Sequence, residues 1–472
     1  MNANTLRRLV AIFVAAAAMG MGGMSGMGGI GSAHAQMPDV QKDIEAREEG
    51  MAYHIGVLAY IYAYPAVDLM HVMGKETRHV ADRQQVYAPV NQFFNYRFLA
   101  APGASGDLRG ANNDTVYFTA WVDLAAGPVV LETPDTAGRY YTIGVTDLYA
   151  ETEHIGRRTT GTHAGRFLLA PPGWQGTVPK GMRLIRNTTP VVYLIGRMYS
   201  AGDADLAEAN RLIDAFHLSP LDPSKSLTPR SFPVREDLNR VEFFTWMNRI
   251  LREGPRHPGE AALMAQFDRI GVGPDKVFDL DKASPAVRRG LEQAVTEGAR
   301  LVALAAREEL TPGWIVRRDL GTYGYNYLGR ASVVRTGTSA NRAEENLYPA
   351  ALFSSDGKLL NGGRRYTIRF EKGQLPPVDA FWSIAVYDAR DHQLISNPIR
   401  RYSIGDRTPG LEFAADGSLT LYLQADEPAQ GKHNWLPTPR GVFYLVARLY
   451  QPRKAALDGT YQMPPLQVVE GN

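Results

Sequence analysis

Carboxylate, imidazole and guanidinium side chains are concentrated in one short stretch, D-L-Y-A-E-T-E-H-I-G-R-R-T-T-G-T-H, from Asp147 to His163. Asp147, Glu153 and His154 can donate or accept a proton, and the same groups are ligands for a hard metal ion. Their spacing matches no sharp metal motif. We therefore predict that these three residues are catalytic acid–base groups. A bound divalent metal ion is one alternative, and a solvated loop at a sheet edge is the structural one.

Two further sets of polar residues could hold a substrate. Arg157 and Arg158 offer planar donor forks that suit a carboxylate or phosphate, although paired arginines on loops are more often solvated or structural. Asn113, Asp114 and Tyr117 open an apolar strand, where they could face a pocket; Asn and Asp in such places also make turns with their own backbone. We predict all five as substrate-binding residues.

Several familiar chemistries are excluded by what the sequence lacks. It has no G-x-S-x-G elbow, no phosphate-binding G-x-x-x-x-G-K-[ST] loop and no H-E-x-x-H motif, so a common serine hydrolase, a P-loop enzyme and a zincin are poor interpretations. There is no cysteine, which excludes disulfides and thiolate chemistry. No cofactor other than the alternative metal ion is predicted.

The N-terminus has the order of a secretory signal peptide. Arg7 and Arg8 precede an apolar run from Leu9 to Met19, and the small-x-small sequence Ala33-His34-Ala35 follows. The apolar run is shorter than the roughly 20 residues that span a bilayer. We predict cleavage near Ala35 and a periplasmic or secreted protein with no membrane span in its mature chain. The paired arginines leave the twin-arginine route as an alternative to general secretion.

The charge balance favours no polyanionic partner. Lys+Arg number 51 and Asp+Glu 49, and removal of Arg7 and Arg8 leaves 49 of each. We therefore predict no nucleic acid and no anionic membrane surface as a partner. A small or oligomeric organic ligand remains, and a homo-oligomer is compatible with the sequence.

Two segments occur twice, in the same order. R-Y-Y-T-I-G-V-T-D (139–147) matches A-F-W-S-I-A-V-Y-D (380–388), and V-V-Y-L-I-G-R-M-Y (191–199) matches V-F-Y-L-V-A-R-L-Y (442–450). Their period-two alternation is typical of strands with two unlike faces. The chain thus contains two related β units, and short strands between turns favour sandwiches or jelly rolls.

The repeated strands also predict a pairing of charges. Each first strand ends on an aspartate that shares its face with large apolar residues, so the charge needs a partner. We predict that Asp147 pairs with Arg197 and Asp388 with Arg448, or that each aspartate meets a nearby cluster of backbone donors.

Helical spacing precedes and separates the β units, as in the stretch from Pro285 to Leu310. We predict an α+β fold, mainly β, with two related β-sandwich or jelly-roll-like domains. The predicted parts are a signal peptide (1–35), an N-terminal helical segment (36–109), a first β unit (110–200), a helical connecting region (201–320) and a second β unit (321–472).

Longer motifs identify a resemblance. N-N-D-T-V-Y-F-T-A-W-V-D-L and H-I-G-R-R-T-T-G in the first half, and L-P-P-V-D-A-F-W-S-I-A-V-Y-D and N-P-I-R-R-Y-S-I-G-D-R in the second, are present. The chain resembles a mostly bacterial family that joins two domains of unknown function, numbered 1254 and 1214. The resemblance implies two jelly-roll-like domains with helical elaborations, and no established catalytic residues.

These observations favour an exported enzyme, a hydrolase or related acid–base catalyst acting on a small or oligomeric organic substrate. The alternatives are a non-catalytic ligand- or carbohydrate-binding protein of the cell envelope, and a structural partner in a larger assembly.

Overall fold

A computed structural model of the chain describes residues 40–78, 87–103, 110–225, 240–254, 258–274, 276, 278–305 and 312–469. The predicted signal peptide lies outside the described residues. From Ala46 onward the chain forms one compact unit.

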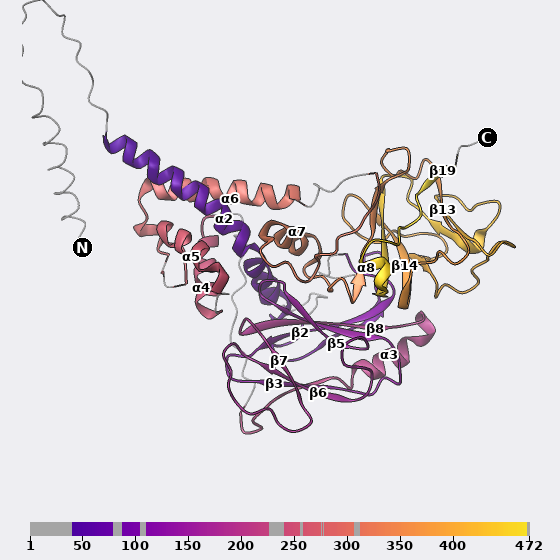
Figure 1. The fold of residues 1–472 in the computed structure, drawn as a ribbon, viewed down its shortest axis with the longest axis horizontal. Helices are drawn as coiled ribbons and strands as arrows, with labels where there is room; N and C mark the ends of the chain where they lie inside the picture. The colour runs from indigo at the N-terminus through magenta and orange to yellow at the C-terminus, as the bar shows by residue number, and fades with distance from the viewer. Residues whose placement is uncertain are drawn as a thin grey trace, which may run out of the picture. The chain divides into compact units, whose positions relative to one another are not determined.

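The first β unit is built of two sheets. The larger has the strand order β1-β2-β8-β4-β5 and the smaller β7-β6-β3-β9. Neighbouring strands are antiparallel except β6 and β7, which are parallel. The bounds are β1 Phe94–Leu99, β2 Thr115–Asp123, β3 Val129–Thr133, β4 Tyr141–Asp147, β5 Thr152–Gly156, β6 Gly165–Ala170, β7 Arg183–Arg186, β8 Val191–Tyr199 and β9 His217–Pro220 (Figure 1).

The second β unit has the same arrangement. One sheet has the order β10-β12-β18-β14-β15, with β11 also paired to β18, and the other β17-β16-β13-β19. Here β16 and β17 are the parallel pair. The bounds are β10 Gly313–Ile315, β11 Asn346–Leu347, β12 Ala350–Phe353, β13 Arg365–Phe370, β14 Val378–Asp388, β15 Ser403–Gly405, β16 Leu419–Gln424, β17 Trp435–Pro437, β18 Phe443–Pro452 and β19 Gln467–Val469.

The repeated segments lie on equivalent strands of the two units. β4 and β14 contain the two copies of the first repeated segment, and β8 and β18 contain the two copies of the second. In both copies these two strands pair in the same register, so that Thr142 lies opposite Arg197 and Ser383 lies opposite Arg448. The repeated segments of the sequence therefore correspond to a repeated sheet.

Each unit buries a hydrophobic core that receives side chains from both of its sheets. In the first unit Phe118 and Leu194 of the larger sheet share a core with Leu131 of the smaller. In the second, Ile384 of β14 shares a core with Tyr366 of β13. Within the described residues the sheets are open, and the fold is a mixed α and β fold with mainly antiparallel sheets.

Strand β8 is buried on both faces, and this decides where its arginine lies. Val192 and Leu194 belong to the core of the first unit, whereas Tyr193 and Ile195 belong to another core that includes the helices. Alternation places Arg197 on the same face as Tyr193 and Ile195. The guanidinium is thus directed into the interior of the molecule, away from the core between the first unit's two sheets.

Most of the described helices contribute side chains to this interior, while two of them pack on the cores of the β units. Their bounds are α2 Val40–Glu76, α3 Leu206–Ile213, α4 Phe243–Glu253, α5 Ala261–Phe267, α6 Pro285–Ala305, α7 Tyr327–Gly337 and α8 Lys454–Leu457 (Figure 1). α2 and α6 approach closely at glycines: a Cβ on Gly290 would lie 2.3 Å from the carbonyl oxygen of Glu49, and one on Gly298 would lie 2.5 Å from the Tyr60 ring. Any larger residue at either position would force the two helices apart.

Among the described helices, α2 alone has the length and apolarity to cross a membrane, with a mean hydropathy of 1.3 in its most apolar window. Of that window, 78% is buried inside the protein. A core helix has the same properties, so its composition is accounted for by packing.

The observed elements differ from the predicted segments at three places. β1 lies within the segment predicted to be helical (36–109), and β9 and β10 lie within the helical connecting region (201–320). These short strands pair with sheet neighbours that lie far away in the sequence, which local periodicity does not reveal. α2 also continues through Pro65, although proline usually ends or kinks a helix.

Candidate functional site

The Asp147 carboxylate stabilises the turn between β4 and β5. It is buried and accepts hydrogen bonds from the backbone N–H of Tyr149 (2.8 Å) and of Glu151 (3.0 Å), and from the hydroxyl of Thr188. Burial raises the pKa of Asp147, against the effect of these donors. All of these partners belong to the protein, so the carboxylate is occupied by its own fold.

The predicted ion pairs with the closing strands are wrong, while the alternative of backbone donors is correct for Asp147. Arg197 donates to Asn341 rather than to Asp147, and Arg448 donates to the carbonyl of Gly110 rather than to Asp388. The two residues of each predicted pair lie on opposite faces of adjacent strands: Asp147 is opposite Val192, one position out of phase with Arg197. Asp388 pairs with its near neighbour Arg390 instead.

The side chains of Glu153 and His154 point to opposite faces of the sheet, because they are adjacent in a strand. Glu153 is exposed and forms an ion pair with Arg342 (2.7 Å). His154 is buried: its Nε2 accepts the backbone N–H of Arg342 (3.1 Å), which leaves Nδ1–H to donate to Oγ1 of Thr142 (3.1 Å). Both nitrogens of the neutral ring are therefore engaged.

His154 should make stability depend on pH. Burial, followed by Arg158, Arg197 and Arg342, lowers the pKa of His154 well below its usual value. Below a pH of about 6.5, His154 binds a proton in the unfolded chain but stays neutral in the folded protein. The contribution of this residue to the free energy of unfolding is therefore present above that pH and is lost as the pH falls. The slope is up to about 1.4 kcal/mol per pH unit.

We expect His154→Gln to flatten this dependence in urea unfolding between pH 7 and pH 5, and His163→Gln to serve as a control that removes an exposed imidazole. An unchanged slope in His154→Gln would contradict the assignment.

Arg157 and Arg158 contact the second unit. Arg157 is exposed and donates to the carbonyl of Asp379 (3.3 Å). Arg158 forms an ion pair with the buried Glu345 (2.8 Å), which also accepts the hydroxyl of Tyr140 (2.9 Å). Both arginines thus bind residues of the other β unit.

Asp114 also binds the other β unit, whereas its neighbour Asn113 binds within its own half of the chain. Asn113 donates to the carbonyl of Ala100 (2.6 Å). The Asp114 carboxylate accepts the hydroxyls of Ser383 (2.7 Å) and Tyr450 (2.9 Å). Burial raises the pKa of Asp114, and Arg448 acts in the opposite direction.

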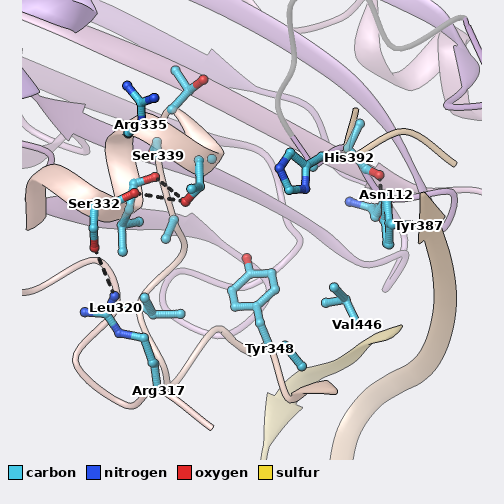
Figure 2. Close-up of a pocket in the computed structure, with 18 of the residues that line it drawn as sticks. Asn112, Arg317, Leu320, Ser332, Arg335, Ser339, Tyr348, Tyr387, His392 and Val446 are labelled. Carbon is cyan, nitrogen blue, oxygen red and sulfur yellow. Dashed lines mark hydrogen bonds between the residues drawn. The ribbon is translucent and has the colours of Figure 1, made fainter. Parts of the chain in front are cut away.

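Tyr117 is the one member of the eight predicted site residues that lines a cavity of about 750 Å³ between the two β units and α7. Its hydroxyl accepts hydrogen bonds from the backbone N–H (3.1 Å) and the side-chain amide (2.6 Å) of Asn112. Figure 2 shows the cavity opening between α7 and the strands, with its labelled lining residues Asn112, Arg317, Leu320, Ser332, Arg335, Ser339, Tyr348, Tyr387, His392 and Val446.

Two buried arginines form the charged part of the cavity wall. Arg197 donates from Nη1 to Oδ1 of Asn341 (2.8 Å) and lies 5.3 Å from the centre of the Tyr117 ring. Arg448 donates from Nη2 to the carbonyl of Gly110 (2.9 Å) and lies 5.4 Å from the centre of the Tyr387 ring. Nη1 of Arg448 is buried without a hydrogen-bond partner.

The wall carries positive charge without negative charge. Among the described lining residues there are four arginines and no aspartate or glutamate. Arg317 is neutralised by Asp319 (2.8 Å), and Arg335 is engaged in other interactions. Arg197 and Arg448 form no ion pair with any carboxylate in the described part of the chain.

The rest of the cavity wall suits an apolar or aromatic group. Tyr387 and Tyr444 are stacked, with ring centres 5.3 Å apart, and Val446 and Tyr348 lie beside them. His392 lies at the same wall, with Nδ1 3.2 Å from the Tyr444 hydroxyl. Its φ of 60° is rare for a residue other than glycine.

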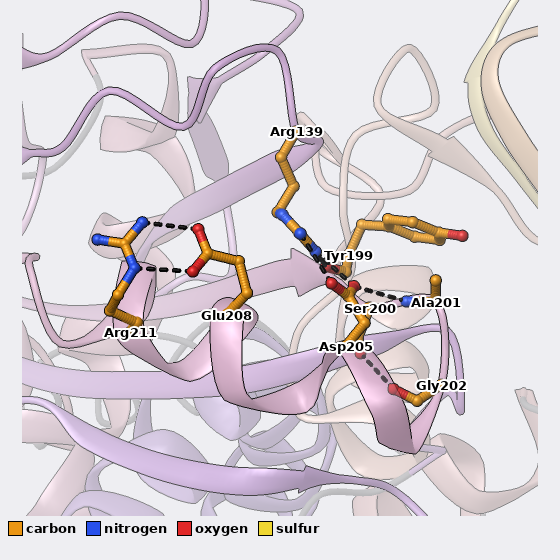
Figure 3. A network of polar contacts seen from close by, with 8 residues as sticks. All are labelled: Arg139, Tyr199, Ser200, Ala201, Gly202, Asp205, Glu208 and Arg211. Atoms are coloured by element: carbon orange, nitrogen blue, oxygen red, sulfur yellow. Dashed lines mark hydrogen bonds and ion pairs between the residues drawn. The ribbon is translucent and has the colours of Figure 1, made fainter.

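A second hollow, of about 570 Å³, is lined by the predicted residue Arg157 and is a weaker candidate because Arg139 and Arg211 in its wall are already paired. Figure 3 shows Arg139 bound to Asp205 and Arg211 bound to Glu208, each through two guanidinium nitrogens. Such pairs leave little charge for a ligand.

The described residues contain no set of ligands for a metal ion. In the ranges that the structure describes, no three His, Asp or Glu side chains are grouped so that they could hold an ion. The divalent metal stays an untested alternative.

The comparison with protein families decides the identity of both halves. The model described as "Protein of unknown function (DUF1254)" matches residues 90–220, and that described as "Protein of unknown function (DUF1214)" matches residues 345–454. Together the two matches cover just over half of the chain. This chain is a DUF1254–DUF1214 protein.

Solved structures are similar to this DUF1254–DUF1214 protein, and the first of them agrees with its fold. A crystal structure of a Vibrio parahaemolyticus protein is 27% identical, with a TM-score of 0.67, and the match covers 89% of this chain and 100% of that one. An uncharacterized protein from Burkholderia cenocepacia is 14% identical with a TM-score of 0.41, over 91% and 95% of the two chains. No curated protein matches the sequence.

The sequence analysis assigned a different role to two of the most informative cavity residues and missed a third. The repeat marks Arg197 and Arg448, but we interpreted them as partners for aspartates. Their position on the face away from each unit's own core is the signal that points to a shared interior. Tyr348 was missed because no repeated segment includes it.

Proposed function

We propose that this DUF1254–DUF1214 protein binds a small organic anion in the cavity between its β units. The observation that carries the proposal is the pair of buried arginines, Arg197 and Arg448, in a cavity wall without acidic residues. Neither arginine has a direct ion pair, and the buried carboxylates that act on them, Asp114 and Glu345, lie outside the wall. An anionic ligand would supply a direct ion pair and offset the cost of burying these charges.

The size and lining of the cavity support an organic ligand. About 750 Å³ is within the usual range for small-molecule sites. Tyrosine rings and Val446 offer apolar contact, while the guanidinium forks suit a carboxylate.

We also propose that the protein is exported and that its two β units are sandwiches. The N-terminal sequence up to Ala35 supports a signal peptide and thus a periplasmic or secreted location. The cores shared by two sheets in each unit support jelly-roll-like sandwiches.

An acid–base enzyme acting on the bound anion is the second candidate function. His392 supports it, because an imidazole hydrogen-bonded to Tyr444 lies at the wall of the same cavity. A hydrolase would use such a group to activate water. His392, rather than His154, is the candidate base, since both ring nitrogens of His154 are engaged with protein atoms.

Pairs of ligands that differ in charge test the binding proposal. We expect millimolar benzoate and octanoate to raise the unfolding temperature of the purified protein, and benzamide and octanamide not to do so, because only the acids neutralise the arginines. The control is sodium chloride at equal ionic strength. Equal stabilisation by acid and amide, or none by any acid, would overturn the proposal.

A further inference from the structure

The two cavity arginines have matching surroundings. Strand pairing places Arg197 between Tyr117 on β2 and Thr142 on β4. Arg448 lies opposite Ser383 on β14. On its other side Asn346 pairs with Tyr450 and Ala350 with Val446, a register that places Tyr348 opposite Arg448. On the neighbouring strands, each arginine is therefore flanked by one tyrosine and one small hydroxyl residue.

Each arginine also reaches across to the other unit at an equivalent position. Arg197 donates to Asn341, seven residues before Tyr348. Arg448 donates to Gly110, seven residues before Tyr117. The exchange is reciprocal, so the two units meet around the cavity in a symmetric manner.

The buried acids nearest to the arginines repeat the same reciprocity and stay outside the cavity wall. Asp114, three residues before Tyr117, binds Ser383 and Tyr450 of the second unit. Glu345, three residues before Tyr348, binds Tyr140 and Arg158 of the first. Both carboxylates are held by other groups, and neither lines the cavity.

From this arrangement we infer that the ligand carries two anionic groups, one for each arginine, and that dicarboxylates joined by an apolar spacer are its chemical class. The inference rests on the proposed anion binding and extends it. A ligand with a single carboxylate would form an ion pair with one buried guanidinium and leave its equivalent without one. Two acids on one molecule satisfy both, and the second group binds at a high effective concentration.

The spacer is the part that the tyrosines would contact. Tyr117, Tyr348 and the stacked pair of Tyr387 and Tyr444 lie in the wall with the arginines. A spacer of carbon atoms, aliphatic or aromatic, would meet these rings, whereas a short polar diacid would not fill the cavity.

Titration calorimetry with the purified protein tests the inference through ligands matched in length. The probes are the unbranched dicarboxylates from succinate to decanedioate, each against the monocarboxylate of equal chain length, and benzene-1,4-dicarboxylate against its monoamide. We expect the best diacid to bind at least about tenfold more tightly than its matched monoacid, with affinity passing through a maximum as the spacer lengthens.

Single variants should remove this advantage. Arg197→Met and Arg448→Met should each lower the affinity for the diacid to about that for the monoacid, and circular dichroism would confirm that each is folded. Monoacids that bind as tightly as diacids in the unaltered protein would overturn the two-anion inference while leaving anion binding intact. If neither class binds, the proposed function itself fails.

Discussion

Arg448→Met should weaken the binding of organic anions far more than it destabilises the ligand-free protein. The guanidinium of Arg448 is buried, forms one hydrogen bond to the Gly110 carbonyl and leaves Nη1 without a partner. A methionine of similar length removes this charge and packs among the surrounding tyrosines. Arg448 also stabilises the charge of the buried Asp114 carboxylate, so we expect the melting temperature of the ligand-free variant to fall slightly.

The effect on binding should be much larger. Loss of a charge-assisted hydrogen bond to the ligand costs about 1.5–3 kcal/mol, or roughly 10- to 100-fold in Kd. Titration calorimetry with the tightest-binding dicarboxylate would measure it, because a monocarboxylate can still bind at Arg197. Arg400→Met is the exposed control and should leave Kd unaltered, since its weak ion pair with Asp203 lies at the surface.

A buried arginine with a structural role provides the second comparison. Arg330 is surrounded by Tyr62, Tyr149 and Tyr327, at 5.1–5.3 Å from their ring centres, and donates to the Tyr62 carbonyl. Arg330→Met should therefore destabilise the protein, by about 2 kcal/mol. If Arg448→Met lost as much stability as Arg330→Met and retained anion binding, Arg448 would be a structural residue and the proposed function would lose its main support.

Asp147→Ala should destabilise the protein strongly and leave ligand binding intact. The substitution removes the acceptor for two backbone N–H groups and for the Thr188 hydroxyl in a buried turn. Each buried donor left unpaired costs about 1–3 kcal/mol, so we expect a loss of about 3 kcal/mol in urea unfolding. Asp147→Asn keeps a carbonyl acceptor and should lose less than about 1 kcal/mol, because burial already disfavours the charge.

The equivalent aspartate of the second unit is the matched control. Asp388 is bound by the side chain and backbone N–H of the exposed Arg390, so water can replace its partners. Asp388→Ala should lose less than about 1 kcal/mol. If Asp147→Ala abolished binding or turnover while remaining as stable as the unaltered protein, Asp147 would act in chemistry after all.

The composition of the predicted site explains why most of it is structural. Asp114, Arg158 and His154 are polar residues in buried strands or at the seam between units, where each must find a protein partner. A sequence shows that such groups need partners. It does not distinguish a partner in the fold from a partner in a substrate.

The sequence by itself determined the two domains, their order and the repeated strands, because period-two alternation and long local motifs depend only on neighbours along the chain. It also marked Arg197 and Arg448 as equivalent. Tertiary structure alone decided that these arginines line one cavity and that Asp147 faces its own turn. The partner of a buried charge depends on strand register and on the packing of segments more than 100 residues apart, such as those of Arg448 and Gly110. Local sequence patterns do not reveal which of these segments come into contact.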